Sequence, residues 1–287
     1  MGFIDDQVFV AVDLETSGIN PYDNEIIELG AVRFTVGGVS AEYSSLVRPT
    51  RKLDPASSKI HKLTPEELQE GGQDLPIALN EFKEFIGSDS LVFHNAPFDL
   101  SFLKVGLESA KYPMLNNQYV DHLYLSRQYL KSRKSHSLEN IKLELELEIG
   151  SHRARDDAFI TAKSMIFLLN EYADRLNSAK KFRSFLRYIR RCSEFEIKLP
   201  TNFNHIQKFV SDSQRAGKVI KFIHTERGRR VSVPAKIEQL LVFNQNIFFK
   251  LDPVGKGGES LVPIAELSFI DSELGELSVL DVGKNPR

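Results

Sequence analysis

Two acidic residues stand one residue apart at the end of a run of β-forming residues, and they constrain the fold of the N-terminal half. The run Phe9-Val10-Ala11-Val12 leads directly into Asp13, Leu14 and Glu15. Because side chains alternate between the faces of a strand, Asp13 and Glu15 project from the same face. Two neighbouring carboxylates repel each other unless a cation lies between them. The pattern therefore indicates a hard divalent metal ion with oxygen ligands, although acids that simply face water fit so short a pattern equally well.

Two later segments bring more acids and two histidines to positions where helices are expected to begin. A short apolar strand, Leu91-Val92-Phe93, leads through His94 to Asp99. His152 and Asp157 lie just before a strongly apolar helical segment. For Asp99 alone, the favourable interaction of a negative charge with a helix N-terminus is a sufficient explanation. Several such segments in one chain favour a shared site instead.

Taken together, the segments resemble the DEDDh family of 3′→5′ exonucleases over roughly residues 7–172. The three motifs of that family are D-x-E-T, H-N-x-x-F-D and H-x-x-x-x-D. They are matched here by Asp13, Glu15 and Thr16, by His94, Asn95, Phe98 and Asp99, and by His152 and Asp157. Lesser matches follow the family's order at residues 26–32, 60–64 and 120–127. This many motifs in order are far more specific than any one of them.

The resemblance implies a metal centre and its chemistry. Two divalent cations, Mg²⁺ or Mn²⁺, are expected on four carboxylates from separated segments: Asp13, Glu15, Asp99 and Asp157. Such a pair of ions relieves the charge on the attacking and leaving oxygens of a phosphodiester. His152 is expected to be the general base that takes a proton from the attacking water, and the ordinary histidine pKa of about 6.5 suits that role. The expected products are nucleoside 5′-monophosphates.

Other residues receive supporting roles from the same resemblance. Thr16 is expected to offer donors to the terminal nucleotide, and His94 and Asn95 are expected to line the substrate. Glu28 lies on a strand expected beside the acids and is interpreted as a hydrogen-bond partner behind the metal ligands.

Composition limits the class of protein. With 287 residues the chain is long enough for two domains. Its 41% hydrophobic and 26% charged residues are typical of a soluble globular protein. No apolar run approaches ~18 residues and no signal peptide is visible, so we expect neither a membrane partner nor secretion. The single cysteine, Cys192, fits a reducing cytoplasm. With a net charge of −2, a nucleic-acid surface must come from clustered basic residues.

The order of elements predicts an α/β exonuclease domain over residues 1–174. Strands are expected at 8–14, 26–36, 41–48 and 91–93, and helices at 65–85, 98–105, 118–130, 138–147 and 157–173. Thr64 and Glu67 match a capping box, with Pro65 in the first turn. Strands followed by alternation with helices favour a mixed sheet flanked by helices, and the family resemblance implies the ribonuclease H-like fold.

Residues 175–198 are predicted to be a basic connecting helix. The segment carries seven basic residues without an acid up to residue 193, and an apolar stripe runs along one helical face. Four of the basic residues are expected to contact phosphates from one side of that helix: Arg183, Arg187, Arg190 and Arg191. The alternative is a helix that only joins two domains and turns its basic side to solvent.

Residues 199–287 are predicted to be a small β-rich accessory domain. A helix at 205–216 is followed by strands at 218–224, 231–233, 237–243, 247–251, 260–263 and 267–270. Short strands at this spacing favour a small barrel. The order of elements loosely resembles the WYL domain, an Sm-like barrel, with Ile247-Phe248-Phe249 in place of that family's Trp-Tyr-Leu.

The sequence therefore predicts a cytoplasmic, metal-dependent 3′→5′ exonuclease. Its expected substrates are single-stranded or 3′-ended nucleic acids, with DNA favoured, and a DNA polymerase or another repair protein is an expected partner. One alternative is an enzyme that trims RNA, because single strands are bound mainly through phosphates and stacking. Another is a nucleic-acid-binding or polymerase-accessory module without activity, which the intact acids and His152 argue against.

Overall fold

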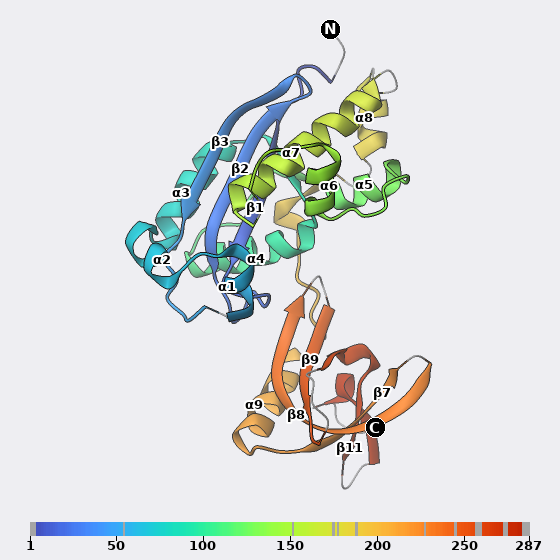
Figure 1. Cartoon of the computed structure of the whole chain (residues 1–287). Helices are drawn as coiled ribbons and strands as arrows, with labels where there is room; N and C mark the ends of the chain where they lie inside the picture. Colours follow the sequence, from blue (N-terminus) through green and yellow to red (C-terminus); the bar gives the residue numbers. More distant parts are fainter. Residues whose placement is uncertain are drawn as a thin grey trace. The chain divides into compact units, whose positions relative to one another are not determined.

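The computed structural model describes residues 4–53, 55–150, 152–173, 176, 178–186, 189–226, 228–243, 246–255, 260–271 and 275–282. The chain folds into two compact units, Met1–Glu196 and Ile197–Arg287. Figure 1 shows both units. The first unit thus continues past residue 174, where the sequence predicted its end, and takes in most of the predicted basic connector.

A six-stranded mixed sheet forms the centre of the first unit. Its strands lie in the order β3-β2-β1-β4-β5-β6. Their bounds are Phe9–Thr16 for β1, Ile26–Thr35 for β2, Gly38–Leu46 for β3, Ser90–Phe93 for β4, Gln118–Asp121 for β5 and Arg190–Arg191 for β6. The first three strands are antiparallel neighbours, β4 and β5 run parallel to β1, and β6 is antiparallel to β5. This mixed α/β arrangement is the one predicted for residues 1–174.

Helices cover both faces of this sheet (Figure 1). Helix α7, Ala154–Glu171, packs on one face against a core that includes Phe9, Phe34 and Val92. Helices α3, Leu75–Ile86, and α4, Ala96–Ser109, pack on the other face. The remaining helices are α1, Pro55–His61; α2, Pro65–Gly71; α5, His122–Tyr129; α6, Leu138–Glu144; and α8, Ala179–Leu186.

Local sequence signals explain several helix boundaries. The predicted capping box at α2 is present, with the Glu67 main-chain N–H donating to Thr64 Oγ1 at 3.1 Å and the Thr64 N–H donating to Glu67 at 2.8 Å. Ser137 caps α6 and Asp121 caps α5 in the same way, through side chains that accept from main-chain N–H groups. Asp121 therefore fixes the point where β5 ends and α5 begins.

Three helix predictions were wrong. The single helix expected at 65–85 is two helices, α2 and α3, because Gln73 between them pairs with Val47. Residues 118–130 were expected to be one helix, but Gln118–Asp121 is the strand β5, because pairing with β4 overrides the helical pattern of the segment. Of the helix expected at 175–198, the described residues form α8, and Arg190–Arg191 instead pair with β5 at the edge of the sheet. The apolar face of α8 packs inward through Phe182, Phe185 and Leu186, which belong to the core beneath α7.

The second unit is mainly β. Helix α9, Phe203–Arg215, precedes an antiparallel sheet in the order β10-β9-β8-β7-β11-β12. The strands are Ile220–Glu226, Arg229–Phe243, Asn246–Pro253, Ser260–Pro263, Ser268–Asp271 and Gly275–Ser278 for β7 to β12. The two strands predicted at 231–233 and 237–243 are one long strand, β8, with an irregularity between Ile237 and Gln239. Phe222 and Phe249 are fully buried in its core.

Candidate active site

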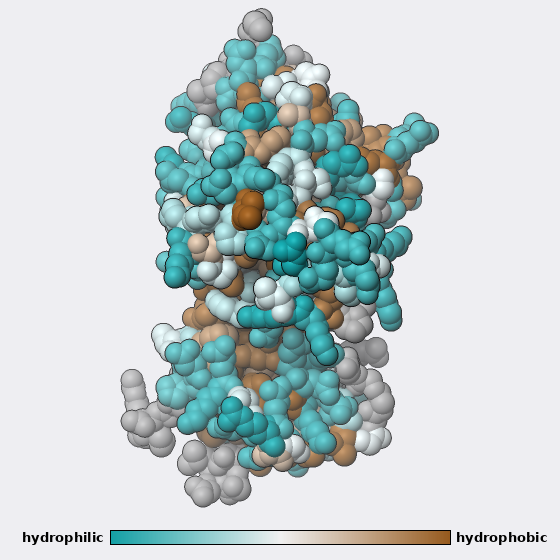
Figure 2. Space-filling model, turned by 90° about the vertical axis from the view of Figure 1, so that its left-hand side faces the viewer, coloured by the Kyte–Doolittle hydropathy of each residue, from teal (hydrophilic) through white to brown (hydrophobic). Residues whose placement is uncertain are grey.

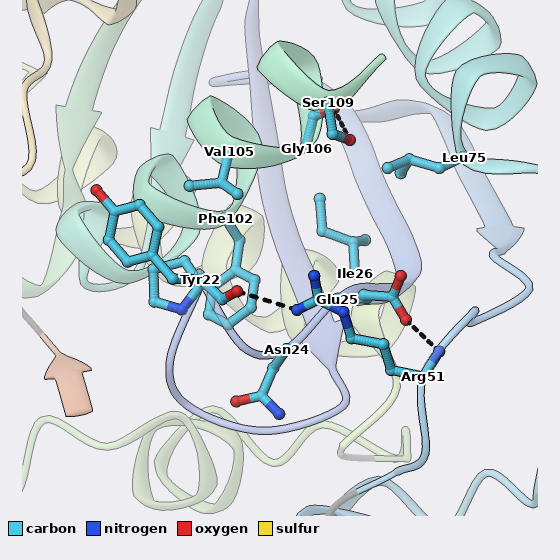
Figure 3. A pocket seen from close by; sticks show the side chains of 11 residues that line it. Tyr22, Asn24, Glu25, Ile26, Arg51, Leu75, Phe102, Val105, Gly106 and Ser109 are labelled. Atoms are coloured by element: carbon cyan, nitrogen blue, oxygen red, sulfur yellow. Dashed lines mark hydrogen bonds between the residues drawn. The ribbon is translucent and has the colours of Figure 1, made fainter. Parts of the chain in front are cut away.

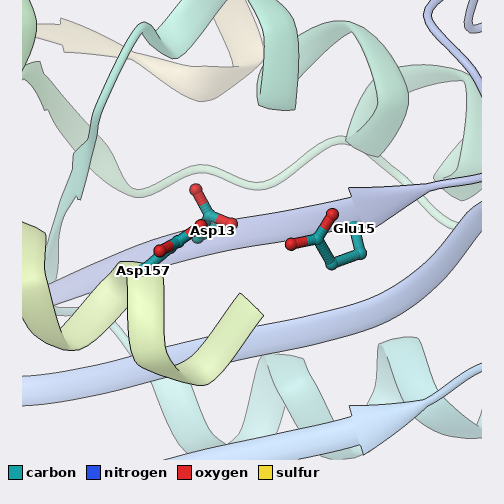
Figure 4. A group of neighbouring side chains, drawn as sticks. All are labelled: Asp13, Glu15 and Asp157. Carbon is teal, nitrogen blue, oxygen red and sulfur yellow. The ribbon is translucent and has the colours of Figure 1, made fainter. Parts of the chain in front are cut away.

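Three carboxylates converge where β1 meets the first turn of α7. Asp13 and Glu15 extend from the same face of β1, as their spacing predicts, and Asp157 reaches them from α7 (Figure 4). One oxygen of each carboxylate lies within 4.8 Å of the other two. Such a group of oxygen ligands fits a hard divalent cation. The Asp157 Oδ1 atom strengthens this fit, because it is buried and, among the described residues, has no hydrogen-bond partner.

Asp99 approaches the same strand from the first turn of α4. Its side chain is buried, with 2% of the residue exposed. The main-chain N–H groups of Leu14 and of Asp99 itself hydrogen-bond to its carboxylate and oppose the rise in its pKa that burial causes. Its charge also contributes to the raised pKa of Asp13. The fold thus brings together the four acids that the sequence singled out.

The acids strongly disfavour one another's ionised forms. Burial first, and then the charges of Asp99, Asp157, Glu15 and Glu28, raise the pKa of Asp13 well above its usual value. Burial and the charge of Asp157 raise the pKa of Glu15 to about 8. Burial likewise raises the pKa of Asp157 to about 6, against the opposing effect of His152. Opposite charge placed between these carboxylates would relieve the repulsion, which is the electrostatic signature of a cation site.

Glu28 links the start of α7 to the sheet through hydrogen bonds. It lies directly opposite Glu15 on β2 and is only 1% exposed. The Arg153 guanidinium donates to both of its oxygens, with contacts of 3.0 Å from Nη2 to Oε1 and from Nε to Oε2. The Ala154 main-chain N–H adds a bond of 3.1 Å, and the Ser44 hydroxyl one of 3.2 Å. Because α7 carries Asp157, these contacts position that carboxylate relative to β1.

His152 lies at the edge of the acid cluster. Its side chain is exposed, and its backbone adopts the left-handed region with φ of 60°. Its main-chain N–H donates to Asp157 Oδ2 at 3.2 Å, and its charge lowers the pKa of that acid. The imidazole is therefore close to the acids and accessible to solvent. The assignment of His152 as general base stays a prediction.

Two residues predicted to contact substrate have polar groups engaged within the protein. Thr16 is buried, and its hydroxyl donates to the Gly18 carbonyl oxygen at 2.7 Å. Asn95 caps α4 in the left-handed conformation, with φ of 80°, and its main-chain N–H donates to Asp121 Oδ1 at 3.3 Å. Asparagine tolerates this conformation better than most residues. Their direct roles toward a nucleotide stay predictions.

His94, also predicted to line the substrate, is half-buried and begins a row of hydrogen-bonded polar groups that leads to the fully buried His122 and Ser164. Its Nδ1 lies 2.9 Å from Nδ1 of His122, whose Nε2 lies 2.9 Å from Oγ of Ser164 on α7. Arg133 donates to that Oγ at 3.1 Å. Burial lowers the pKa of His94 to about 4 and that of His122 well below its usual value, so both rings are neutral. One ring must then donate and the other accept.

The sequence did not predict the hydrogen-bonded contact between His94 and His122. His122 directly follows Asp121 in the segment 120–127 that resembles the family, but nothing in its spacing pointed to His94. The pairing depends on the separate strands β4 and β5 lying side by side. The signal available in the sequence was a second histidine, His122, in a segment whose pattern is helical, which by itself is uninformative.

The basic residues of the predicted connector do not lie along one helix. Arg183 is exposed on α8, whereas Arg190 and Arg191 are exposed on β6. Arg187 lies outside the described residues. Because successive side chains of a strand point to opposite faces, Arg190 and Arg191 face different surroundings, and Arg191 donates to the Asn116 carbonyl oxygen at 3.2 Å. The prediction of a single helical track was wrong, while a role of these residues toward phosphates stays a prediction.

A small cavity lies beside the loop that follows β1 (Figure 3). Its volume is about 110 Å³, and residues of the loop, the start of β2 and α4 line it, among them Tyr22, Ile26, Phe102 and Val105. Arg51 closes one side, with Nη1 donating to the Tyr22 carbonyl oxygen at 3.0 Å. None of the four clustered acids lines it, so the cavity is separate from the candidate metal site.

On the face shown in Figure 2, hydrophilic residues cover most of the first unit, and hydrophobic residues are scattered among them. Within the described residues, no helix combines the length and the hydropathy that crossing a membrane requires.

The chain is similar in sequence to bacterial DNA polymerase III chains. It is 37% identical over 159 residues to DNA polymerase III PolC-type of Thermotoga maritima, covering 55% of this chain and 12% of that one. It is 33% identical over 168 residues to DNA polymerase III subunit epsilon of Treponema pallidum, covering 58% of this chain and 78% of that one. The match thus spans about an eighth of the PolC-type chains.

Solved structures share the fold. Cell-death related nuclease 4 (CRN-4) has a TM-score of 0.52 at 12% identity, over 67% of this chain and 83% of that one. E. coli exonuclease I in complex with a dT13 oligonucleotide has a TM-score of 0.51 at 14% identity, over 85% of this chain and 55% of that one. At these identities the likeness concerns the fold alone.

The family assignment rests on the sequence matches. Residues 10–165, more than half of the chain, match the family model described as "RNase_T: Exonuclease". The motifs that carry the resemblance lie within this range and supply the clustered acids of β1, α4 and α7. The chain therefore belongs to the RNase_T exonuclease family.

Proposed function

We propose that the chain is a metal-dependent 3′→5′ exonuclease that removes nucleoside 5′-monophosphates from the end of a single nucleic-acid strand. The observation that carries the proposal is the convergence of Asp13, Glu15 and Asp157 within 4.8 Å, with Asp99 buried against the same strand. Cations placed between the four carboxylates would relieve their mutual repulsion, and the buried Asp157 Oδ1, which has no hydrogen-bond partner among the described residues, is a ligand atom available to them.

Two divalent cations, Mg²⁺ or Mn²⁺, would be held by Asp13, Glu15, Asp99 and Asp157. When bound, they supply charge relief on the attacking and leaving oxygens of the phosphodiester. The protein contributes the fixed geometry: β1 holds two ligands on one face, and the Glu28–Arg153 contact holds α7 in place for the third. Glu28 itself is fully engaged with Arg153, Ala154 and Ser44, which suits a supporting role behind the ligands.

His152 is the proposed general base. The imidazole is exposed to solvent, and the residue lies beside Asp157, to which its main-chain N–H donates. Its main-chain bond to Asp157 ties the histidine to a metal ligand without using the ring, which leaves both ring nitrogens for proton transfer.

DNA is the substrate that the comparisons favour. The relatives carry the names of DNA polymerase III chains, and one protein of shared fold was solved with a dT13 oligonucleotide. By the same argument the proposed partner is a DNA polymerase and the proposed place of action is the bacterial cytoplasm. Exposed Arg183 and Arg190 are the proposed phosphate contacts of the first unit.

The second unit is proposed to be an Sm-like barrel of the WYL kind that assists nucleic-acid binding. In support, α9 precedes six antiparallel strands, β7 to β12, a short 3-10 turn at Ile264–Glu266 separates β10 from β11, and β11 pairs with β7.

The test uses matched DNA and RNA oligonucleotides of one sequence, labelled at either end. With Mg²⁺ we expect stepwise shortening from the 3′ end, release of 5′-monophosphates, and complete loss of cleavage with a chelator. Faster shortening of the RNA would assign the RNA-trimming alternative. Absence of cleavage with both metals, while the oligonucleotides still bind, would identify a binding module and overturn the proposal.

A further inference from the structure

A second, larger cavity lies at the carboxyl end of β5, and none of the four clustered acids lines it. Its volume is about 380 Å³. Its wall is formed by Ala96 and Pro97 at the start of α4 and by Tyr119 and Asp121 on β5. Tyr124 on α5, Leu186 on α8 and Arg190 on β6 complete the wall. All these residues belong to the first unit.

The cavity adjoins the acid cluster. Ala96 and Pro97 stand in the same first turn of α4 as Asp99. Asp121, another residue of the wall, is near enough to Asp99 for its charge to raise the pKa of that acid. The two sites are therefore separated by little more than the start of one helix. A strand whose terminal phosphodiester lies at the acids must cross a neighbouring surface, and this cavity is the hollow in that surface.

The chemistry of the wall suits a nucleotide. Tyr119 and Leu186 are buried and form an apolar floor, whereas Tyr124 is 38% exposed. The Arg190 side chain interacts with the Tyr119 hydroxyl, which holds the guanidinium beside the apolar floor. Aromatic faces stack on any base, and an arginine beside them can contact a phosphate.

The one acid that lines the cavity, Asp121, does not prevent the binding of an anionic nucleotide. Asp121 Oδ1 accepts hydrogen bonds from the main-chain N–H groups of Asn95, at 3.3 Å, and Tyr124, at 3.2 Å. These donors offset its charge and turn that oxygen toward the protein. Arg190 is thus the charged group at the rim that is suited to meet an incoming anion.

We infer that this cavity binds a nucleotide of the substrate strand upstream of the terminal one, with Tyr124 stacking on its base and Arg190 contacting its phosphate. The inference rests on the proposed exonuclease function and adds the surface that guides the strand to the acids. It also separates Arg190 from its neighbour Arg191, which lines a different cavity together with Asn116 and Gln118.

The experiment compares two substrates in the full chain with Mg²⁺. One is the p-nitrophenyl ester of thymidine 5′-monophosphate, which has no upstream nucleotide. The other is a single-stranded decamer, intact or with one abasic position moved along it. The variants are Tyr124→Ala and Arg190→Gln, with Arg191→Gln as the matched arginine and Tyr112→Ala, a tyrosine beyond the far end of α4, as the aromatic control.

We expect Tyr124→Ala to raise KM for the decamer roughly 5- to 150-fold, the loss measured when one stacked base is given up, with kcat and hydrolysis of the small ester unchanged. One upstream abasic position should raise KM to a similar degree in the wild type and add nothing in Tyr124→Ala. Arg190→Gln should raise KM for the decamer more than Arg191→Gln does. Tyr112→Ala should have the KM of the wild type.

Equal KM values for Tyr124→Ala and wild type, or equal effects of the two arginine changes, would overturn the inference. A wild type that cleaves neither substrate would instead overturn the proposed function. The cavity is then tested by the anisotropy of a fluorescent decamer: weaker binding by Tyr124→Ala and Arg190→Gln supports it, and unchanged binding rejects it.

Discussion

A Cβ atom on Gly30 would lie 2.1 Å from the carbonyl carbon of Ala154. Strand β2 and the first turn of α7 are therefore in backbone contact, with no room for a side chain between them. Gly30 is paired with Asp13 across the sheet, and Ala154 begins the helix that carries Asp157. The separation between the acids of β1 and the acid of α7 is thus set by the lack of a side chain at residue 30.

Replacing Gly30 by alanine should displace the start of α7 and lower the rate. A misplacement of about 1 Å at a catalytic group costs roughly 10²-fold, so we expect a loss of that order together with a lower melting temperature. The matched control is Gly71→Ala, whose added Cβ would find its nearest neighbour, Leu46 Cδ1, at an ordinary 3.6 Å. A Gly30→Ala variant as fast as the control would show that the helix is free to shift without harm.

The metal-free protein should lose stability as the pH rises. The folded pKa of Glu15 is about 8 against a usual 4.5, and that of Asp157 is about 6 against 3.8. The folded state therefore holds protons that the unfolded state has released, and stability falls between about pH 4 and pH 8. Chelated protein melted across this range should show a falling midpoint, and saturating Mg²⁺ or Mn²⁺ should restore most of it.

Removing one of these charges should stabilise the apo protein while destroying the site. Glu15→Gln keeps the shape of the side chain and removes the charge that faces Glu28 and Asp157, so its metal-free melting temperature at pH 8 should exceed that of the wild type. Metal titration by calorimetry should show weakened binding, and cleavage should fall to near background. A metal-free Glu15→Gln that melts below wild type at pH 8 would contradict the raised pKa.

His152 can be tested without disturbing its backbone. The residue has φ of 60°, which asparagine accepts more readily than alanine, so His152→Asn is the appropriate change. The main-chain bond to Asp157 remains, and metal binding should be preserved. Loss of a general base costs roughly 10²–10⁴ in rate, and we expect kcat to fall in that range at constant metal affinity. Retention of the wild-type rate would assign the proton transfer to another group.

Local patterns sufficed for some parts of the fold and the site. Alternation along β1 placed Asp13 and Glu15 on one face, and the capping box at Thr64 marked the start of α2. They failed where distant segments decide the structure. Gln118–Asp121 is a strand because β4 lies beside it, and the His94–His122 contact requires the same pairing. The close approach of Gly30 to Ala154 likewise joins residues far apart in sequence, which no local period encodes.

The packing of α8 indicates that the exonuclease unit does not end at residue 174, where the sequence predicted its boundary. Phe182, Phe185 and Leu186 are all buried in the core that underlies α7, and Tyr129 on α5 stacks on Phe185 with ring centroids 4.4 Å apart. Burial of each such side chain is worth roughly 1.5–3 kcal/mol, so removing all three takes away an amount comparable to the whole stability of a typical domain, about 5–15 kcal/mol.

A chain ending at residue 174 should therefore be unfolded or aggregated, although it holds every catalytic motif. A chain ending at Glu196, the limit of the first compact unit, should fold and keep its metal-dependent hydrolysis of the small ester. Circular dichroism and thermal melting of the two truncations, beside the full chain, provide the measurement. If the shorter chain melts cooperatively near the full-length temperature, then α8 and β6 are accessory to the exonuclease unit. If the longer one fails to fold, the second unit is needed for its stability.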